Sequence, residues 1–161
     1  RETFQLLTKK LSLAPTPSQT IGYYDSLNTN ENHIFGHYFR NLYQILKVID
    51  RGVNENKNRE YARILRAQLS FYELAILFIN CLDGINDTGE FRELLIKYQM
   101  LEHLVIHSTK VPNFIVAQSF TVTAESVQQY AGEQADGNFF GGAFGKNSGV
   151  PISLRGWKRE K

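Results

Sequence analysis

The stretch LSFYELAILFINCL, residues 69–82, decides the fold class. Apolar side chains occupy nearly every side of a helix built from it, and such a helix has to be covered by protein on all sides. The stretch forms the second half of a helix predicted over residues 58–82. It is shorter than the roughly 20 apolar residues of a membrane-spanning helix. We therefore predict that it is the central helix of a bundle.

The flanking segments supply the helices that would cover it. Apolar residues recur at helical spacing, and they predict three more helices, over residues 3–13, 32–51 and 87–107. Asn30 is the expected N-cap of the second helix, and Gly52 follows its far end. Residues 18–31 are rich in Asn, Ser and Thr, which predicts a loop. The expected fold class is all-α, a helical bundle of about four helices.

The last third of the chain has weaker patterns. Residues 111–123 contain Val, Ile, Phe and Thr, which is typical of a strand or an extended segment, and residues 124–134 could form a short helix. Residues 137–149 are rich in Gly and Phe without a period, so we expect irregular structure there. The expected organisation is a helical domain over residues 1–110 and an irregular C-terminal extension over residues 111–161, packed on the domain or trailing from it.

The composition indicates one ordinary globular domain. The chain has 161 residues with a net charge of +2 and a single cysteine, Cys81. The charge is too small to indicate a nucleic-acid or membrane partner, and one cysteine excludes an internal disulfide. Cys81 sits in an apolar run, so we expect a buried thiol and a cytoplasmic protein. Because the chain begins at Arg1, we also expect a longer parent, in which a preceding segment could tether it to the inner membrane.

Polar side chains recur along one line of each of two consecutive predicted helices. In helix 32–51, steps of three and four place six of them on one face: His33, His37, Arg40, Gln44, Lys47 and Arg51. Helix 58–82 carries a second line: Arg66, Ser70, Glu73 and Asn80. Two helices joined by a short connector pack antiparallel, so we expect the two lines to face each other.

Glu73 is the key residue of this expected seam. A carboxylate in an apolar helix needs a partner, and we expect Glu73 to be buried and bonded to Arg40 or Gln44. One interpretation is a buried pair that sets the helix register. The other is an acid–base pair in a cleft, with His37, Arg40 and Glu73 as candidate catalytic residues. The candidate binding residues are Gln44, Arg66 and Asn80.

We expect no metal and no cofactor. His33 and His37, like His103 and His107, have the i, i+4 spacing of chelating pairs, but carboxylate or thiolate ligands are missing around them. The Gly-rich residues 139–145 lack the Lys-Ser/Thr of a phosphate loop. Basic residues gather in two small groups that are typical of solvated surface and support a nucleic-acid partner only weakly: Arg59, Arg63 and Arg66 on one helix, and Arg155, Lys158, Arg159 and Lys161 at the end of the chain.

Several sequence blocks, in order, resemble the phage abortive infection (AbiC-like) family. They are HYFRNLYQI (residues 37–45), YARILRAQLS (61–70), EL at 73–74, FINC (78–81) and LIKYQMLEHL (95–104). TFQLL at residues 3–7 also resembles the opening helix of that family, so the resemblance covers residues 2–107. It implies defence against bacteriophage by arrest or death of the infected cell. It also implies that members often carry N-terminal membrane helices.

Two functions remain open at this point. The first is a defence effector or sensor domain that acts through a protein partner or self-association, with a phage component as a candidate trigger. The alternative is a metal-independent helical ribonuclease toxin that uses His37 and Arg40. Such ribonucleases follow an Arg-polar-His order, and here Ile45 and Leu46 occupy the places of the His.

Overall fold

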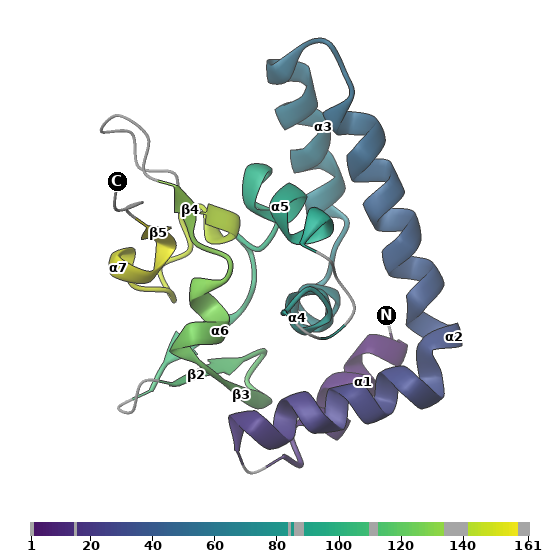
Figure 1. Ribbon diagram of the computed structural model, residues 1–161, viewed down its shortest axis with the longest axis vertical. Coiled ribbons are helices and arrows are strands. Elements are labelled where there is room, and N and C mark those ends of the chain that lie inside the picture. Colours follow the sequence, from purple (N-terminus) through teal and green to yellow (C-terminus); the bar gives the residue numbers. More distant parts are fainter. Residues whose placement is uncertain are drawn as a thin grey trace.

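Figure 1 shows the computed structural model of the chain. It describes residues 2–14, 16–83, 85, 89–109, 113–133 and 142–157, with the backbone alone at residues 31–34, 133 and 155–157. The helices are α1 (Glu2–Leu11), α2 (Pro17–Asp50), α3 (Glu55–Ala67), α4 (Phe71–Asn80), α5 (Glu90–Lys97), α6 (Ala124–Gln128), the 3-10 turn η1 (Gly142–Phe144) and α7 (Ile152–Arg155). The strands are β1 (Ile106–Ser108), β2 (Asn113–Val116), β3 (Phe120–Thr123), β4 (Gly132–Glu133) and β5 (Gly156–Trp157).

The prediction of a central helix is confirmed by α4. Every side chain from Leu74 to Ile79 is at most 1% exposed. In Figure 1 this helix is seen end-on in the middle of the molecule, with α1, α2, α3 and α5 around it. The neighbouring thiol of Cys81 is also buried and forms no disulfide. An apolar surface on all sides leaves no face that could stand in water, so the interior is the place where this helix is stable.

The all-α prediction is wrong. The described residues are mostly helical, yet β1, β2 and β3 form an antiparallel sheet in that order. Side chains alternate between buried and less buried along β2 and β3, because successive residues of a strand point to opposite faces. This sheet includes the described part of the segment predicted to be a strand or extended. A parallel pair, β4 and β5, lies farther along the chain.

The predicted loop over residues 18–31 is also wrong, because α2 runs through it. The Thr16 hydroxyl caps the helix by accepting a hydrogen bond from the Gln19 amide at 3.3 Å, and Pro17 is the first helical residue. Asn30 is therefore inside the helix and not its N-cap. Thr20 and Tyr24 are fully or almost fully buried, so tertiary burial outweighs the low helix propensity of the Asn, Ser and Thr residues. Figure 1 shows that α2 changes direction along its length.

The helix predicted over residues 58–82 is two helices, α3 and α4. Ser70 is the N-cap of α4. Its hydroxyl accepts a hydrogen bond from the Glu73 amide, and the Glu73 carboxylate accepts one from the Ser70 amide at 2.7 Å. This reciprocal pair is a capping box, which starts a new helix by satisfying two amides that would otherwise lack partners. At the other end, α3 begins at Glu55 with Asn54 as N-cap. Gly52 directly follows Arg51, the C-cap of α2, as predicted.

The helix predicted over residues 87–107 is much shorter. The helix α5 spans Glu90–Lys97, and β1 begins at Ile106. Gln99 adopts a left-handed backbone, with φ of 54°. The amides of Gln99 and Met100 reach back to the carbonyls of Ile96 and Leu95, which is the Schellman arrangement that ends a helix. The predicted Asp87 end lies outside the described residues, and Gly89 is the N-cap in the structure.

The C-terminal segment contributes to the same core as the helices. Ala143, Phe144 and Val150 are fully buried in the cluster that also contains α4. The Tyr130 hydroxyl donates to the Phe78 carbonyl in α4. Of the residues 124–134 predicted as a short helix, α6 covers only Ala124–Gln128, and the described part of residues 137–149 holds the turn η1. In the described part of the chain, no helix is both long and apolar enough to cross a membrane.

Candidate functional site

A basic pocket opens between α3 and the C-terminal end of α5. It contains about 280 Å³ of space, part of which is open to solvent. Three arginines, one lysine and two neutral residues line it, and no lining residue is acidic: Arg59, Arg63, Arg66, Lys97, Tyr98 and Gln99. Positive side chains around a concave surface favour the binding of anions. We refer to this site as the basic pocket.

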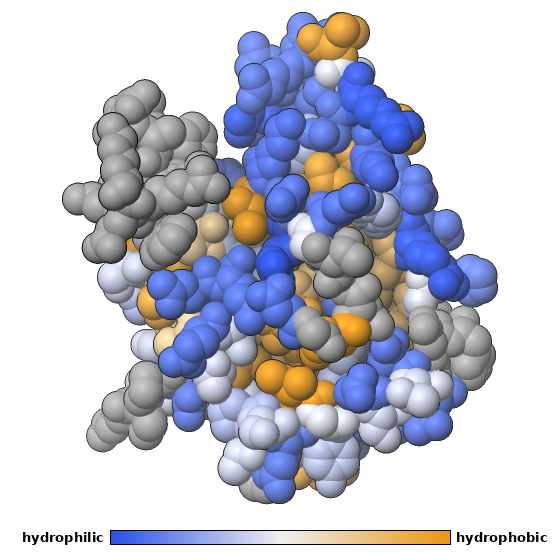
Figure 2. All heavy atoms as spheres, in the orientation of Figure 1, coloured by the Kyte–Doolittle hydropathy of each residue, from blue (hydrophilic) through white to orange (hydrophobic). Residues whose placement is uncertain are grey.

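The arginines reach the pocket because of their spacing on α3. Arg59, Arg63 and Arg66 follow one another at steps of four and three, which places them on one face of the helix. Arg66 also lies one turn after the buried Ala62, so it stands at the edge between the basic face and the buried face of α3. In Figure 2 hydrophilic side chains predominate over α3 and over the outer side of α2.

Arg66 is the buried cation of the pocket. It is 8% exposed, its Nη2 pairs with Glu102 Oε2 at 2.6 Å, and its Nη1 donates to the Gln99 carbonyl at 2.7 Å. These contacts connect α3 to the turn that follows α5. An arginine carries more N–H donors than the two contacts use, so Arg66 can still donate to a ligand in the pocket.

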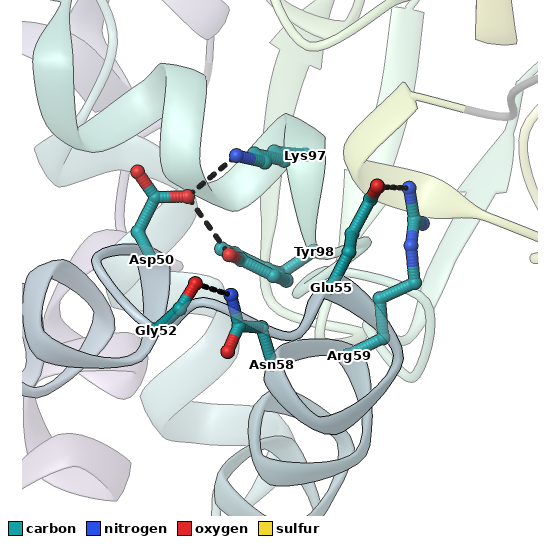
Figure 3. Close-up of polar contacts among 7 residues, drawn as sticks. All are labelled: Asp50, Gly52, Glu55, Asn58, Arg59, Lys97 and Tyr98. Carbon is teal, nitrogen blue, oxygen red and sulfur yellow. Dashed lines mark hydrogen bonds and ion pairs between the residues drawn. The ribbon is translucent and has the colours of Figure 1, made fainter.

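The other three cations are more exposed. Arg59 Nη2 pairs with Glu55 Oε1 at 2.8 Å, one turn earlier on α3, and Figure 3 shows this pair beside Tyr98. Lys97 Nζ pairs with Asp50 Oδ1 at 2.6 Å. Arg63 is exposed and forms no hydrogen bond or ion pair with any residue that the structure describes. Exposed pairs contribute little to stability and are easily exchanged for another anion.

Asp50 holds the end of α5 against the end of α2. Its Oδ1 accepts hydrogen bonds from Lys97 Nζ and, at 2.8 Å, from the Tyr98 hydroxyl, as Figure 3 shows. The hydrogen bond from Lys97, helped by that from Tyr98, keeps the pKa of Asp50 below its ordinary value despite partial burial. Burial and the Asp50 carboxylate raise the pKa of Tyr98. At neutral pH, Asp50 is therefore charged and Tyr98 remains a hydrogen-bond donor.

Gln99 lines the pocket in a strained conformation. A left-handed backbone is costly for any residue with a Cβ, and glycine is the usual residue at this position of a Schellman motif. Here a glutamine occupies it, and its carbonyl accepts from Arg66. Strain at a pocket wall is a common mark of a functional position.

We expect Gln99→Gly to raise the free energy of unfolding by about 1 kcal/mol, because glycine removes the left-handed strain. The measurement is urea denaturation followed by circular dichroism. Gln68→Gly is the control, since Gln68 is an exposed residue with φ of −84° just after α3. There glycine brings no relief of strain and lowers stability slightly. A Gln99→Gly variant that is no more stable than the original chain would show that the left-handed backbone of Gln99 costs no stability.

The predicted seam between α2 and the next helices does not form. The side chains of His37, Arg40 and Gln44 are exposed on α2, whereas Arg66, Glu73 and Asn80 are buried. The burial of Glu73 confirms one prediction, but its partner was predicted wrongly. The Tyr38 hydroxyl, and neither Arg40 nor Gln44, donates to Glu73 Oε1 at 2.9 Å. Among the described residues, no hydrogen bond or ion pair therefore brings Glu73 together with His37 or Arg40.

The buried polar residues are satisfied separately. Burial alone would raise the pKa of Glu73, but the hydrogen bonds from Ser70 and Tyr38 outweigh it and lower that pKa. Asn80 Oδ1 accepts from the buried Tyr24 hydroxyl at 2.8 Å. These contacts join α4 to α2 and to the preceding turn, which is a structural role.

The remaining candidates are spread over the surface or lie beyond the description. His103 and His107 are exposed, and His107 lies in β1 and not at a helix end. The side chains of His33 and Arg155 lie outside the described part, as do Lys158, Arg159 and Lys161. Among the described residues, no three His, Cys, Asp or Glu side chains are grouped so that they could hold a metal ion.

The sequence patterns found half of the basic pocket. The basic face of Arg59, Arg63 and Arg66 was recognised, and Arg66 was already a candidate binding residue. Lys97, Tyr98 and Gln99 were missed, because a longer helix was expected through them. No local signal marked them, because Leu94, Leu95, Tyr98 and Leu101 continue the helical apolar spacing through this stretch.

Comparison with known proteins identifies a family for the middle of the chain. Residues 30–109 match the model of the family described as "Putative phage abortive infection protein". The matched region contains all six residues of the basic pocket. It begins later than the resemblance inferred from the sequence, so α1 lies outside it. No curated protein and no solved structure matches the chain.

Proposed function

We propose that this chain, which over residues 30–109 belongs to the phage abortive infection family, is a phage-defence domain that acts by self-association. The family supplies the biological role. The observation that carries self-association is a set of exposed apolar side chains on the hairpin of α2 and α3.

Four large apolar side chains on this hairpin are solvent-exposed. They are Ile45, Val48, Tyr61 and Ile64, each between 47% and 68% exposed. Ile45 and Val48 are three residues apart on α2, as Tyr61 and Ile64 are on α3, so each pair shares a helix face. Apolar side chains in such number on two packed helices favour a protein interface. A second copy of the chain is the simplest occupant, because most soluble oligomers are homo-oligomers.

We expect the double variant Val48→Asp, Ile64→Asp to be monomeric and to lose phage protection, because two buried carboxylates would oppose the interface. Sedimentation velocity of the chain gives the oligomeric state. Plaque counts on cells that express the encoding gene give protection. The control is Lys57→Asp, Glu60→Gln, which changes exposed polar residues of α3 instead. A monomeric original chain, or full protection by the monomeric variant, would refute self-association as the mechanism.

The ribonuclease alternative is tested in the same cells. His37→Ala and Arg40→Ala change exposed side chains, so both variants should fold with nearly unchanged stability. Under our proposal both protect fully. Loss of protection in both, together with RNA cleavage by the original chain alone, would favour the ribonuclease instead.

A further inference from the structure

We propose that the basic pocket binds a small phosphate-bearing ligand, which serves as the signal that the domain reads. The assignment of a ligand class follows from the geometry of the pocket. Its role as a signal rests on the proposed function in phage defence.

The charges around the pocket favour an anion. Four cations line it and no acid does. Three of these cations pair with carboxylates, and none of the three carboxylates lines the pocket. The Glu55–Arg59 pair is exposed and lies within one helix. An incoming phosphate can therefore replace exposed ion pairs at low cost. Arg63 has no described partner to give up.

The position of Arg66 makes the pocket more than a charged surface. Its guanidinium is buried and held from two sides, by Glu102 and by the Gln99 carbonyl. A guanidinium fixed in this way loses little further conformational entropy when it donates to a ligand. Planar guanidinium groups match phosphate oxygens with paired hydrogen bonds. Arg66 thus provides an ordered donor, and Arg63 provides a cation that can close over the ligand.

The size of the pocket limits the ligand. The space of about 280 Å³ includes open solvent at the mouth of the pocket, so the part enclosed by side chains is much smaller than a pocket for a drug-sized ligand. One or two phosphate groups fit this space, with the rest of the ligand directed outward. A free nucleotide or pyrophosphate has this form. An RNA strand would need a basic track that extends beyond one pocket.

The test is isothermal titration of the chain with three probes: pyrophosphate, adenosine triphosphate and a short single-stranded RNA. We expect pyrophosphate and the nucleotide to bind, with an affinity that falls as salt increases. Arg63→Gln should weaken both by about tenfold or more, the effect of one charge-assisted hydrogen bond. Arg63 is exposed, so the variant should fold, and its melting temperature checks this. Lys57→Gln, which removes one charge from α3 outside the pocket, should bind as the original chain does.

The outcomes separate this inference from the proposed function. No binding of pyrophosphate or nucleotide would overturn the inference, while phage protection by the original gene would still stand. Equal weakening by Arg63→Gln and Lys57→Gln, or binding of RNA alone, would also overturn it, because the charge would then act as a diffuse surface. Loss of both binding and protection in Arg63→Gln alone would support the pocket and its role. Full protection by a variant that no longer binds would overturn the role as a signal.

Discussion

Replacing Arg66 with Met is expected to lower the free energy of unfolding by about 3 kcal/mol. The Glu102 carboxylate would lose its cation while its side chain is only 19% exposed. The Gln99 carbonyl would lose its donor at the strained turn. A buried charge without a partner is costly because it has given up its hydration without compensation. Urea denaturation followed by circular dichroism measures the change.

The matched control is Arg63→Met, an arginine of the same helix face that is exposed and has no described partner. Its effect on stability should stay within about 0.5 kcal/mol. Glu102→Leu combined with Arg66→Met should recover part of the loss, because no charge then remains unpaired. An Arg66→Met variant as stable as Arg63→Met would show that the buried pair does not stabilise the fold.

The loss of the Arg66–Glu102 pair in Arg66→Met should also affect the C-terminal segment, which Glu102 contacts. The Oε1 atom of Glu102 accepts from the Lys146 amide at 3.3 Å while Oε2 pairs with Arg66. Amide hydrogen exchange at Lys146 should therefore be faster in Arg66→Met than in the original chain. The same contact connects the wall of the basic pocket to residues outside the matched family region.

Replacing Glu73 with Ala is also expected to lower the free energy of unfolding by about 3 kcal/mol. The change removes the hydrogen bond from the Ser70 amide to the Glu73 carboxylate, which completes the capping box and contributes about 1 kcal/mol. It also removes the acceptor of the Tyr38 hydroxyl, and hydrogen bonds to charged groups contribute about 1.5–3 kcal/mol. Tyr38→Phe removes only the hydroxyl and should cost clearly less. Equal stability of Glu73→Ala and the original chain would refute this account.

The stability that the Glu73 carboxylate contributes should depend on pH. The pKa of Glu73 is below its ordinary value of 4.5 in the folded chain. The ionised form is thus stabilised by folding, and this contribution is complete above the unfolded pKa. It is lost as the pH falls through the folded pKa. The stability difference between the original chain and Glu73→Gln should therefore be largest near neutral pH and shrink in acid. A difference that grows below pH 4.5 would contradict the direction of the shift.

Several features missed in the sequence analysis had a readable signal. Ser70 and Glu73 have the spacing of a capping box, which marks a helix start inside the predicted helix 58–82. Thr16 and Pro17 likewise have the order of an N-cap and a first helical residue. Both signals are local and specific, but each lies beside a longer pattern that indicates a different structure: continuous apolar periodicity in one case, and Asn, Ser and Thr content in the other.

Other features had no such signal. The turn between β2 and β3 has positive φ at Ala117 and Gln118, where Asn-Gly is the typical pair. Gln99 ends α5 in a left-handed conformation that usually requires glycine. In each case the surrounding packing stabilises a positive φ that the residue disfavours on its own. The sequence alone therefore predicts a helix that continues to residue 107, and it predicts residues 111–123 as a strand or extended segment without a partner strand.

Local patterns in the sequence are enough to predict the central helix of this protein and one wall of its basic pocket. Residues 71–80 had to be interior because no side of that helix suits water, and Arg59, Arg63 and Arg66 had to share a face because of helical periodicity. The contact between the Gln99 carbonyl and Arg66 depends on the tertiary fold, because 33 residues separate them. The tertiary fold also leaves His37 and Arg40 exposed to solvent. It places the Tyr38 hydroxyl where it donates a hydrogen bond to Glu73. Spacing along one helix is a local property, whereas the partner across an interface depends on how all the buried surfaces pack together.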